Sequence, residues 1–478
     1  MPDNSRVYIT TTLPYVNAEP HLGFALELVQ ADTLARSWRL SGKEVFLNTG
    51  TDEHGLKIYL KSAEEGRSPQ KLSDDYSAKF KALIPLLHIS PDIHFVRTTE
   101  ARHLSAAREF WRRCQQSGDI YKKEYEGKYC VGCELEKTDS ELALGRCPIH
   151  PTLEIEIIKE ENYFFRFSKY QKKLTELYEA KKDFVVPDSR FNEIKAFVER
   201  GIKDFSVSRP KEKVRWGVEV PGDSGHNMYV WFDALVSYLT ALGWPEGEEF
   251  ERFWPAIQFA GKDNLRQQSA MWQAMLMSAG LPPSKQIFIH GFILSAGQKM
   301  SKTAGNVLRP EEVVERFGAE AVRYYLLRHV HPFEDSDVTT EKIKEAYNAN
   351  LANGLGNLTA RILQMSSAYL EKVPEISKDF GSASDKGILN LIGDYKFNQA
   401  MDALWRRMKD LDTFIQEGKT FEIVKKNKIR GEKQLVYLLT NLYEIAVLLE
   451  PFMPETSQKI KAAVAANKKP AALFPRKE

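Results

Sequence analysis

The chain has 478 residues, of which 43% are hydrophobic, and this is enough for about three domains of roughly 150 residues each. Its 67 basic and 65 acidic side chains leave a formal charge of +2, so the protein is not a polycation that binds nucleic acid through net charge alone. The 4 cysteines are too few for a disulfide framework in a chain of this length.

The first residues show no targeting signal. Residues 1–12 lack the basic stretch and the long apolar run of a signal peptide. The most apolar long segment, 229–244, contains Asp233 and is too short to span a bilayer. We therefore expect a cytoplasmic protein that makes no use of a membrane.

The first 115 residues alternate between strand-like and helical patterns. Residues 7–12 and 45–49 are rich in β-forming side chains, and residues 25–39 carry apolar side chains at helical spacing. Strands that alternate with helices favour a parallel sheet with crossover helices. We therefore predict an α/β domain at the start of the chain.

A segment of different character interrupts this domain. Residues 120–165 combine Cys, Gly and His with short alternating pieces, which indicates a small insertion with little core of its own. Helical patterns follow at 169–182 and 191–204. The β/α alternation then resumes in three segments: 227–242, 257–260 and 287–290.

The last part of the chain reads as helical. Four segments carry the helical pattern: 342–367, 388–417, 431–450 and 454–466. We predict an antiparallel helix bundle that begins near residues 340–348. Between residues 418 and 478, 12 Lys and Arg face 6 Asp and Glu, which suits an RNA-facing surface and equally an ordinary solvated helix face.

Four potential zinc ligands lie in the insertion. Cys130 and Cys133 form a C-x-x-C corner, and Cys147 and His150 form a second corner after 13 further residues. Two such corners match tetrahedral ligation of zinc by three thiolates and one imidazole, and a closed site of this kind is structural. A reduced set without metal and a redox pair are the alternatives, although a redox pair does not explain the second corner. Cys114 lies outside the pattern and is expected to be a buried thiol.

Two short segments have the chemistry of phosphate binding. In Leu13–Phe24 a strand gives way to a helix, so that backbone N–H groups and a positive helix end face an anion. There His21 can donate to a phosphate, and Gly23 allows a nucleotide to approach the backbone closely. Gly297–Thr303 places two lysines in a glycine-flanked loop that could clamp a polyphosphate. Either segment alone would also fit an ordinary turn.

In this order and about 280 residues apart, the two segments resemble the HIGH and KMSKS signatures of class I aminoacyl-tRNA synthetases. From Tyr8 to about Ser457 the chain resembles the methionyl-tRNA synthetases. The resemblance implies an α/β Rossmann-type catalytic domain with a parallel sheet and a zinc-binding insertion, followed by an all-α anticodon-binding helix bundle. The resemblance implies a catalytic domain in two halves, 1–115 and 226–290, with the insertion at 116–225 between them. The region of the KMSKS loop and stem contact would be 291–345, and the anticodon-binding bundle would be 346–478.

The resemblance also implies an activity. The enzyme would activate L-methionine with ATP to methionyl-adenylate and transfer it to the 3′ end of tRNA(Met), as a monomer with one structural Zn²⁺ and with Mg²⁺ on the ATP. His21, Lys299 and Lys302 would be the catalytic residues. Another class I aminoacyl-tRNA synthetase and a non-catalytic zinc-containing RNA-binding protein are the rival hypotheses.

The matched motifs assign substrate contacts. ATP would be bound by seven residues: His21, Gly23, Gly261, Asp263, Lys299, Ser301 and Lys302. Methionine would be bound by eight residues: Leu13, Tyr15, Asp52, Trp231, Ala234, Leu235, Tyr238 and Gln268. The carboxylate of Asp52 and the backbone carbonyl of Leu13 would contact its amino group. Arg209 would lie near the substrate carboxylate or the phosphates. The aromatic stretch that includes Trp231, taken alone, would also fit an ordinary core.

Three residues of the helical part resemble anticodon readers. Asn357 and Arg361 lie one helical turn apart, so they share a face and could bind bases. Phe421 falls where the family usually has a stacking tryptophan. Packing between helices is the alternative for all three.

The chain departs from the family pattern at three positions. Phe24 replaces the second histidine of the HIGH signature, which leaves more of the phosphate binding to His21 or to another donor. Asn264 replaces an aliphatic residue and Gln268 replaces a histidine at the rim of the methionine pocket. A glutamine can still donate a hydrogen bond to sulfur or to a tyrosine.

Overall fold

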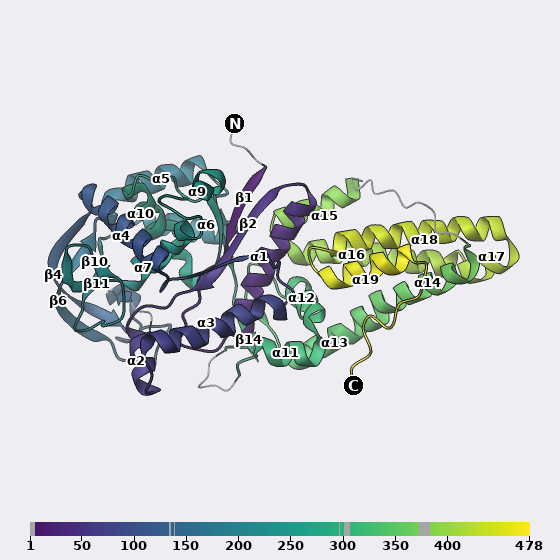
Figure 1. Ribbon diagram of the computed structural model, residues 1–478, viewed down its shortest axis with the longest axis horizontal. Helices are drawn as coiled ribbons and strands as arrows, with labels where there is room; N and C mark the ends of the chain where they lie inside the picture. Colours follow the sequence, from purple (N-terminus) through teal and green to yellow (C-terminus); the bar gives the residue numbers. More distant parts are fainter. Residues whose placement is uncertain (1–4, 133–134, 138, 296, 301–305, 372–382) are drawn as a thin grey trace.

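The protein was analysed as a computed structural model that describes residues 5–132, 135–137, 139–295, 297–300, 306–371 and 383–478. The molecule is elongated, with a sheet-containing half at one end of its long axis and a helical half at the other (Figure 1). Among the predicted site residues, Cys133, Ser301 and Lys302 lie outside the described part of the chain, and for Lys299 only the backbone is described.

Six parallel strands form the central sheet, in the order β3-β2-β1-β12-β13-β7. Their bounds are β1 Arg6–Thr10, β2 Glu44–Thr51, β3 His94–Arg97, β7 Val185–Val186, β12 Ala256–Gly261 and β13 Gln286–His290. Strands β1, β12 and β13 are almost wholly buried, as expected of a parallel sheet that helices cover on both faces.

The strand order reverses between β1 and β12. From β1 the chain passes outward to β2 and β3, whereas from β12 it passes in the opposite direction to β13. In open parallel sheets the crevice at the carboxyl ends of such neighbouring strands is where ligands bind. The fold therefore places the site at the ends of β1 and β12, and the sheet confirms the predicted α/β class.

Helices connect and cover these strands. Helix α1 (Leu22–Leu40) joins β1 to β2, and α2 (Leu56–Glu64) and α3 (Pro69–Leu86) join β2 to β3. The other helices of this half are α4 Ala101–Gln116, α5 Gln171–Ala180, α6 Asp188–Glu199, α7 Val230–Leu235, α8 Ser237–Thr240, α9 Glu248–Phe253 and α10 Trp272–Ser278. Short 3₁₀ or π turns accompany them: η1 Asp139–Glu141, η2 Phe167–Tyr170, η3 Lys262–Asn264 and η4 Gln267–Met271.

The segment that interrupts the sheet builds sheets of its own. A long antiparallel ladder between β4 (Ile120–Cys130) and β6 (Glu156–Phe165) carries β5 (Leu135–Lys137) and β8 (Phe205–Ser206) at its edges. A three-stranded sheet adds β9 Ser208–Pro210, β10 Glu219–Val220 and β11 Asp223–Met228. Strand β7 lies within the range 116–225, yet it pairs with β13 as an edge of the central sheet. Its 2 residues carry no periodic pattern that a sequence could reveal.

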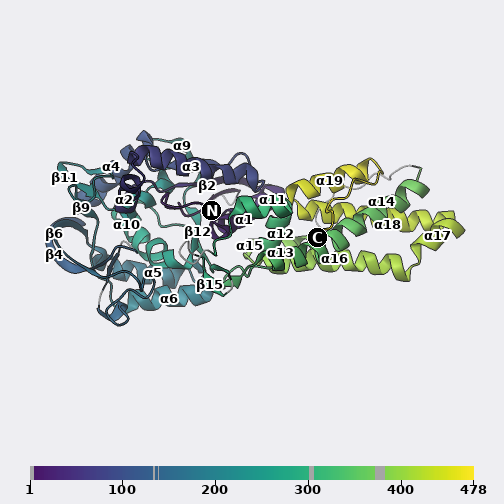
Figure 2. The same ribbon diagram turned by 90° about the horizontal axis from the view of Figure 1, so that it is seen from below.

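Beyond β13 the chain forms a small sheet and then helices. The sheet has the order β15-β14-β16, with the bounds β14 Ile293–Ser295, β15 Gln298–Lys299 and β16 Ser336–Asp337. The helices are α11 Pro310–Phe317, α12 Ala319–Arg328, α13 Thr340–Ala346, the π-helical η5 Tyr347–Gly356, α14 Asn357–Tyr369, α15 Ala383–Gly393, α16 Phe397–Glu417, α17 Thr420–Lys426, α18 Lys428–Leu449 and α19 Pro454–Ala465. Figure 2 shows helices α14, α16, α18 and α19 packed side by side along the long axis.

The predicted bundle is confirmed, with differences in its helices. The segment 388–417 is two helices, because Tyr395 takes a left-handed conformation with φ 61°, which ends a helix. The segment 342–367 is three helical pieces with a π-helical stretch in the middle. Helix α17 was not predicted, since its 7 residues are too few to show a periodic pattern. No helix within the described ranges is long and apolar enough to cross a bilayer.

Candidate functional site

The site is assembled from loops at the carboxyl ends of the parallel strands. The loop after β1 is tied to the segment after β2, because the N–H of Asp52 donates to the Pro14 carbonyl (2.9 Å) and the N–H of Val16 donates to the Asp52 carbonyl (3.2 Å). Gly261 ends β12 and His290 ends β13 at the same edge of the sheet. Residues predicted to bind methionine and ATP therefore come together from distant parts of the chain.

His21 caps the amino end of α1. Its Nδ1 accepts a hydrogen bond from the backbone N–H of Gly23 (3.1 Å), so a neutral ring carries its proton on Nε2. A Cβ on Gly23 would lie 2.9 Å from Cε1 of His21. Glycine is therefore required for the imidazole to lie against this turn. The exposed ring at a positive helix end has the properties of a donor to an anion.

The segment that follows the lysine loop lies against this helix end. The N–H of Leu22 donates to the Leu308 carbonyl (3.1 Å), and the N–H of Leu308 lies 3.5 Å from Sδ of Met300. At the start of the loop, Lys299 pairs through its backbone with Leu294 of β14. The two signature segments, far apart in sequence, are thus neighbours in the fold.

Phe24 replaces the second histidine of the signature and has a packing role. Its ring meets Phe80 of α3 edge-on, with the ring centres 5.3 Å apart. An aromatic pair of this kind stabilises the contact between α1 and α3. The replacement therefore joins two helices in place of adding a second imidazole.

A buried acid–base pair lies beneath the start of α1. Glu27 accepts hydrogen bonds from the N–H and the hydroxyl of Thr12 (2.6 and 2.7 Å), and its other oxygen lies 2.8 Å from Nε2 of His290. Nδ1 of His290 donates to the Gly291 carbonyl (2.8 Å). Burial lowers the pKa of His290, but the Glu27 carboxylate outweighs burial and raises it above its ordinary value. The sequence did not reveal this pair, because nothing in it links residue 27 with residue 290.

The segment predicted to contact the ATP ribose is shaped by a glycine. A Cβ on Gly261 would lie 2.9 Å from a carboxylate oxygen of Asp263 and 3.7 Å from Cε1 of His290. Asn264 lies beside the same carboxylate (3.4 Å). Glycine thus lets the Asp263 carboxylate fold back over the end of β12.

The predicted methionine pocket combines apolar walls with one carboxylate. Asp52 is only 5% exposed, and Ala234, Leu235 and Tyr238 are buried. The hydroxyl of Tyr15 donates to the carbonyl of His54 (2.6 Å), next to Gly55, where a Cβ would lie 2.1 Å from that hydroxyl. Leu13 and Trp231 are half-buried, as expected of residues at the mouth of a pocket.

Gln268 acts on this pocket through a tyrosine. Its Nε2 donates to the hydroxyl of Tyr238 (2.7 Å), and its Oε1 accepts from Gln258 (3.2 Å). Burial raises the pKa of Tyr238, so the phenol stays neutral and keeps a proton of its own to donate. The hydrogen bond that the sequence analysis allowed for this glutamine therefore runs to Tyr238.

A buried carboxylate holds the pocket from behind. Asp233 is fully buried, and its two oxygens lie 2.6 Å from Nδ1 of His54 and 2.7 Å from Nε2 of His103. Burial would raise the pKa of Asp233, but the two imidazoles lower it well below its ordinary value. Nδ1 of His103 lies 3.1 Å from the Thr240 hydroxyl. The sequence placed Asp233 in a pocket motif but could not reveal its two histidine partners.

Arg209 is held by two aromatic rings and a buried carboxylate. Its guanidinium lies between the rings of Tyr129 (5.3 Å) and Tyr229 (4.7 Å), 3.5 Å from the buried carboxylate of Glu160. It also donates to the hydroxyl of Ser206 (2.5 Å). These contacts join the insertion, through Tyr129, to the segment that leads into the predicted methionine pocket.

Three of the four predicted metal ligands are described, and they cluster. The ligand atoms of Cys130, Cys147 and His150 all lie within 4.8 Å of one another, and Sγ of Cys130 is 3.8 Å from Nδ1 of His150. Tetrahedral zinc would place such a pair about 3.6 Å apart, from Zn–S and Zn–N lengths of about 2.3 and 2.05 Å. A Cβ on Gly132 would lie 2.4 Å from the His150 ring. The described donor set and its glycine cradle therefore fit zinc.

The candidate anticodon residues lie on the helical half. Asn357 begins α14 and is exposed. Arg361, one turn further, is half-buried and lies 2.5 Å from Asp412 of α16. Phe421 of α17 is 45% exposed, which is unusual for a phenylalanine. None of the three is a buried core residue.

Comparisons with known proteins agree with this geometry. The family model described as tRNA synthetases class I (M) matches residues 7–154 and 151–363. A methionine--tRNA ligase from Rhizobium meliloti is 40% identical over 482 residues, which cover 97% of this chain and 93% of the relative. The same enzyme from Thermotoga maritima is 37% identical and covers 98% of this chain and 76% of the relative.

Solved structures give the same result. Methionyl-tRNA synthetase of Mycobacterium tuberculosis in complex with methionyl-adenylate superposes with a TM-score of 0.89 at 34% identity, over 99% of this chain and 100% of that one. The parallel sheet, the reversal of its strand order between β1 and β12 and the helical half thus define a class I aminoacyl-tRNA synthetase. Within that class, the chain belongs to the methionyl-tRNA synthetase family, as the sequence predicted.

Proposed function

We propose that this protein is a methionine--tRNA ligase, which activates L-methionine with ATP and transfers it to tRNA(Met). The observation that carries the proposal is the match of nearly the whole chain, at 34% identity, to a synthetase solved with methionyl-adenylate. The carbonyl and carboxylate groups around the predicted amino-acid site support it. A non-catalytic RNA-binding protein would need neither this pocket nor the phosphate-binding helix end.

The reaction has two steps. A carboxylate oxygen of methionine attacks the α-phosphorus of ATP. The bond from the α-phosphorus to the oxygen that bridges the α- and β-phosphates breaks, and pyrophosphate leaves. A ribose hydroxyl at the 3′ end of tRNA then attacks the carbonyl carbon, and AMP leaves. No covalent bond to the protein forms in either step, so the protein contributes positioning and charge stabilisation.

His21 donates from Nε2 to a phosphate oxygen of ATP. Its tautomer is fixed by the Gly23 N–H on Nδ1, so the donor is prepared before the substrate arrives. Lys299 and Lys302 complete the charge stabilisation from the loop that adjoins α1, and Ser301 lies between them in sequence. Gly261 and Asp263 bind the ribose hydroxyls at the end of β12. Mg²⁺ enters with the ATP as part of the substrate.

Asp52 binds the ammonium group of methionine together with the Leu13 carbonyl. The buried position of the carboxylate makes the ion pair strong, since little water screens it. The thioether lies among Tyr15, Trp231 and Tyr238, whose aromatic edges attract sulfur by roughly 0.3–1.5 kcal/mol each. Because a pocket of this kind discriminates by only about 1–3 kcal/mol per methylene, selectivity depends on shape.

Arg209 supports the site indirectly, by holding the insertion against the segment that begins with Tyr229. Cys130, Cys133, Cys147 and His150 would hold zinc, which would cross-link the two ligand-bearing turns of the insertion. The enzyme works as a monomer, with the bundle residues Asn357, Arg361 and Phe421 on the anticodon of tRNA(Met).

Pyrophosphate exchange with each proteinogenic amino acid tests the proposal. We expect exchange to depend on methionine alone, and we expect purified tRNA(Met) to be charged with methionine. Exchange that prefers another amino acid would assign the chain to a different class I specificity. Absence of exchange with every amino acid, in a folded and zinc-replete preparation, would refute the enzymatic function.

A further inference from the structure

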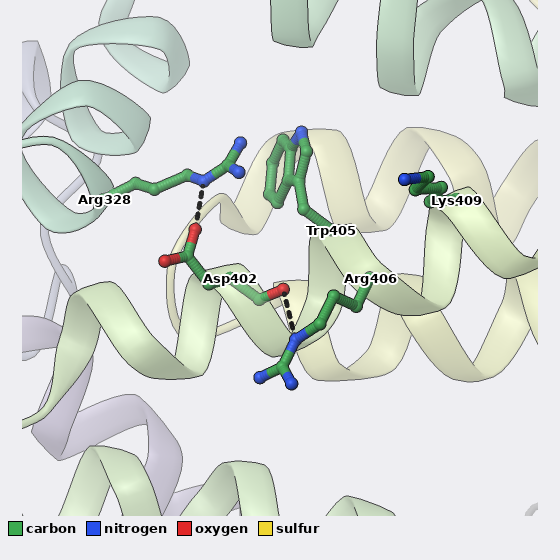
Figure 3. A pocket seen from close by; sticks show the side chains of 5 residues that line it. All are labelled: Arg328, Asp402, Trp405, Arg406 and Lys409. Carbon is green, nitrogen blue, oxygen red and sulfur yellow. Dashed lines mark hydrogen bonds and ion pairs between the residues drawn. The ribbon is translucent and has the colours of Figure 1, made fainter.

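A groove lies on the helical half, where the end of α12 meets α16. It has a volume of about 510 Å³, and Figure 3 shows the five side chains that line it. They are Arg328, Asp402, Trp405, Arg406 and Lys409. Three of the five are cations and one is an anion, so the lining carries an excess of positive charge.

One wall of the groove is made of side chains that contact one another. Nε of Arg328 donates to Asp402 (2.9 Å), its Nη1 donates to the hydroxyl of Tyr324 (2.9 Å), and its guanidinium lies 4.6 Å from the centre of the Trp405 ring. The ring of Tyr324 lies 4.9 Å from the same tryptophan. Because Arg328 and Tyr324 already pack on Trp405, this ring is a poor platform for stacking a base.

The other two cations face solvent. Arg406 and Lys409 are exposed, and Arg406 donates only a long hydrogen bond, to the main-chain carbonyl of Asp402 (3.4 Å). Neither side chain forms an ion pair with any acid in the described part of the chain. Figure 3 shows them as neighbours of Trp405 on one helix. They can therefore bind an external anion without first breaking an internal salt bridge.

The groove lies on the same face of α16 as Asp412, the partner of Arg361. Asp402, Trp405, Lys409 and Asp412 are spaced three or four residues apart, so they form one stripe along α16. Asp412 at the end of the stripe pairs with Arg361 of α14. The ten helical steps from residue 402 to residue 412 span about 15 Å. In the view of Figure 2, α16 and β15 of the lysine-loop region lie on the same side of the molecule.

We propose that the groove binds the phosphate backbone of tRNA, between the part that reaches Arg361 and the part that reaches the active site. This inference rests on the proposed function. Unpaired arginine and lysine side chains are suited to phosphates, which fix the register of an RNA on a protein without reading its sequence. The covered tryptophan argues against base reading. The groove therefore adds affinity and alignment and no anticodon specificity.

Salt dependence of tRNA binding tests the proposal. In the double variant Arg406→Gln/Lys409→Gln, two phosphate contacts are lost. The slope of log K against log salt should then shrink in magnitude by about 1.4–1.8, since each contact contributes about 0.7–0.9. The loss should be equal for tRNA(Met) and for the same tRNA with an altered anticodon. Methionine-dependent pyrophosphate exchange should stay at the parent rate, because it needs no tRNA.

A matched control removes two exposed lysines elsewhere. The variant Lys71→Gln/Lys172→Gln changes the net charge equally, on side chains of α3 and α5 that are 64% and 89% exposed. An unchanged slope in the groove variant, an equal change in this control, or a loss confined to one anticodon would each overturn the proposal. A parent protein that binds and charges no tRNA would instead contradict the proposed function, on which the groove depends.

Discussion

At the scale of single residues, the contact between Gly23 and His21 decides the orientation of the imidazole that we propose as a hydrogen-bond donor to a phosphate of ATP. The imidazole lies against the glycine, and its Nδ1 is occupied by the glycine N–H. The geometry of the donor therefore depends on a residue that has no side chain of its own. This dependence leads to a direct test.

Gly23→Ala should slow adenylate formation by about 10²-fold, because a Cβ at 2.9 Å from the ring must displace the imidazole and misplace its donor by a few tenths of an ångström to about 1 Å. The KM for methionine should change little, since the amino-acid pocket lies elsewhere. Single-turnover measurement of adenylate formation gives the rate.

Gly387→Ala is the matched control. Gly387 lies in α15, where an added Cβ meets nothing within 4 Å. Alanine in a helix is more stable than glycine by roughly 0.5–1 kcal/mol, so this variant should melt slightly higher and keep full activity. Equal rates in the Gly23 variant and the parent would contradict the role given to His21.

Single residues also show where sequence reasoning ends. His21, Gly23 and Asp52 could be singled out because their motifs are local and place them at strand ends. The partners of Asp233 could not, because His54 and His103 are 179 and 130 residues away along the chain. Arg209 was recognised by its motif, yet its packing between Tyr129 and Tyr229 depends on how two sheets of the insertion meet.

At the scale of elements, one arginine connects three of them. Arg323 of α12 is fully buried and lies 2.8 Å from Asp32 of α1. It also donates to the carbonyls of Phe452 (2.7 Å) and Pro451 (2.9 Å), between α18 and α19. The helix that carries His21 at its amino end is thereby fixed to the helical half.

Arg323→Ala should destabilise the protein by about 3–5 kcal/mol, because it leaves Asp32 as a buried charge without its main partner. The double variant Asp32→Asn/Arg323→Met should recover part of the loss, since it removes both charges. Thermal unfolding of the parent and the two variants measures the effect. A single variant as stable as the parent would show that the pair makes no net contribution.

The effect should depend on pH. Burial would raise the pKa of Asp32, but Arg323 and then Arg36 lower it below its ordinary value. A lowered folded-state pKa means that the stabilisation is complete above the ordinary Asp value of about 3.9 and is lost as the pH falls through the folded-state pKa. The difference between parent and Arg323→Ala should therefore be larger at pH 7 than near pH 3.

The proposed zinc site makes the insertion the element whose order we expect to depend on a metal. The segment that carries the predicted zinc ligands contacts both parts of the catalytic half. Nζ of Lys57 in α2 donates to the Gly132 carbonyl (2.7 Å), and Arg266, which follows β12, pairs with Glu141 (2.6 Å). Removal of zinc should loosen residues 130–150 and impair transfer to tRNA more than adenylate formation. Hydrogen exchange with and without chelator tests this. Metal analysis that finds no zinc in reduced protein would contradict it.

Among elements, predictability followed length and periodicity. The helix 25–39 and the strands near residues 7, 45, 257 and 287 were predicted because their patterns are long or strongly apolar. The two-residue strand β7 and the short helix α17 carry too little pattern. The division of 388–417 into α15 and α16 depends on the left-handed conformation of Tyr395. The helix propensities of the residues in this segment do not reveal it.

At the scale of the whole molecule, we expect the two halves to have separable tasks. The residues proposed for adenylate formation belong to the sheet-containing half, whereas Arg361 and Phe421 lie on α14 and α17 of the helical half (Figure 1). The groove along α16 lies between them. A defect in anticodon reading should therefore leave the first reaction intact.

Phe421→Ala and Arg361→Ala should weaken aminoacylation of tRNA and leave methionine-dependent pyrophosphate exchange at the parent rate. Loss of a stacked ring costs about 1–3 kcal/mol in recognition, and an arginine that reads a base edge has a comparable effect. Phe421→Trp should be tolerated, because tryptophan is also a stacking platform. Both reaction rates and the melting temperature are measured on the same preparations.

A core variant of the same bundle separates reading from packing. Ile415 of α16 is 1% exposed, so Ile415→Ala leaves a cavity and should cost about 2–5 kcal/mol of stability. Phe421 is 45% exposed, so its truncation removes little packing and should hardly change the melting temperature. Arg361 is paired with Asp412, and its loss frees a half-exposed carboxylate that water can solvate. If Phe421→Ala instead lowers the melting temperature as Ile415→Ala does and slows both reactions, its ring packs the bundle and does not read the anticodon.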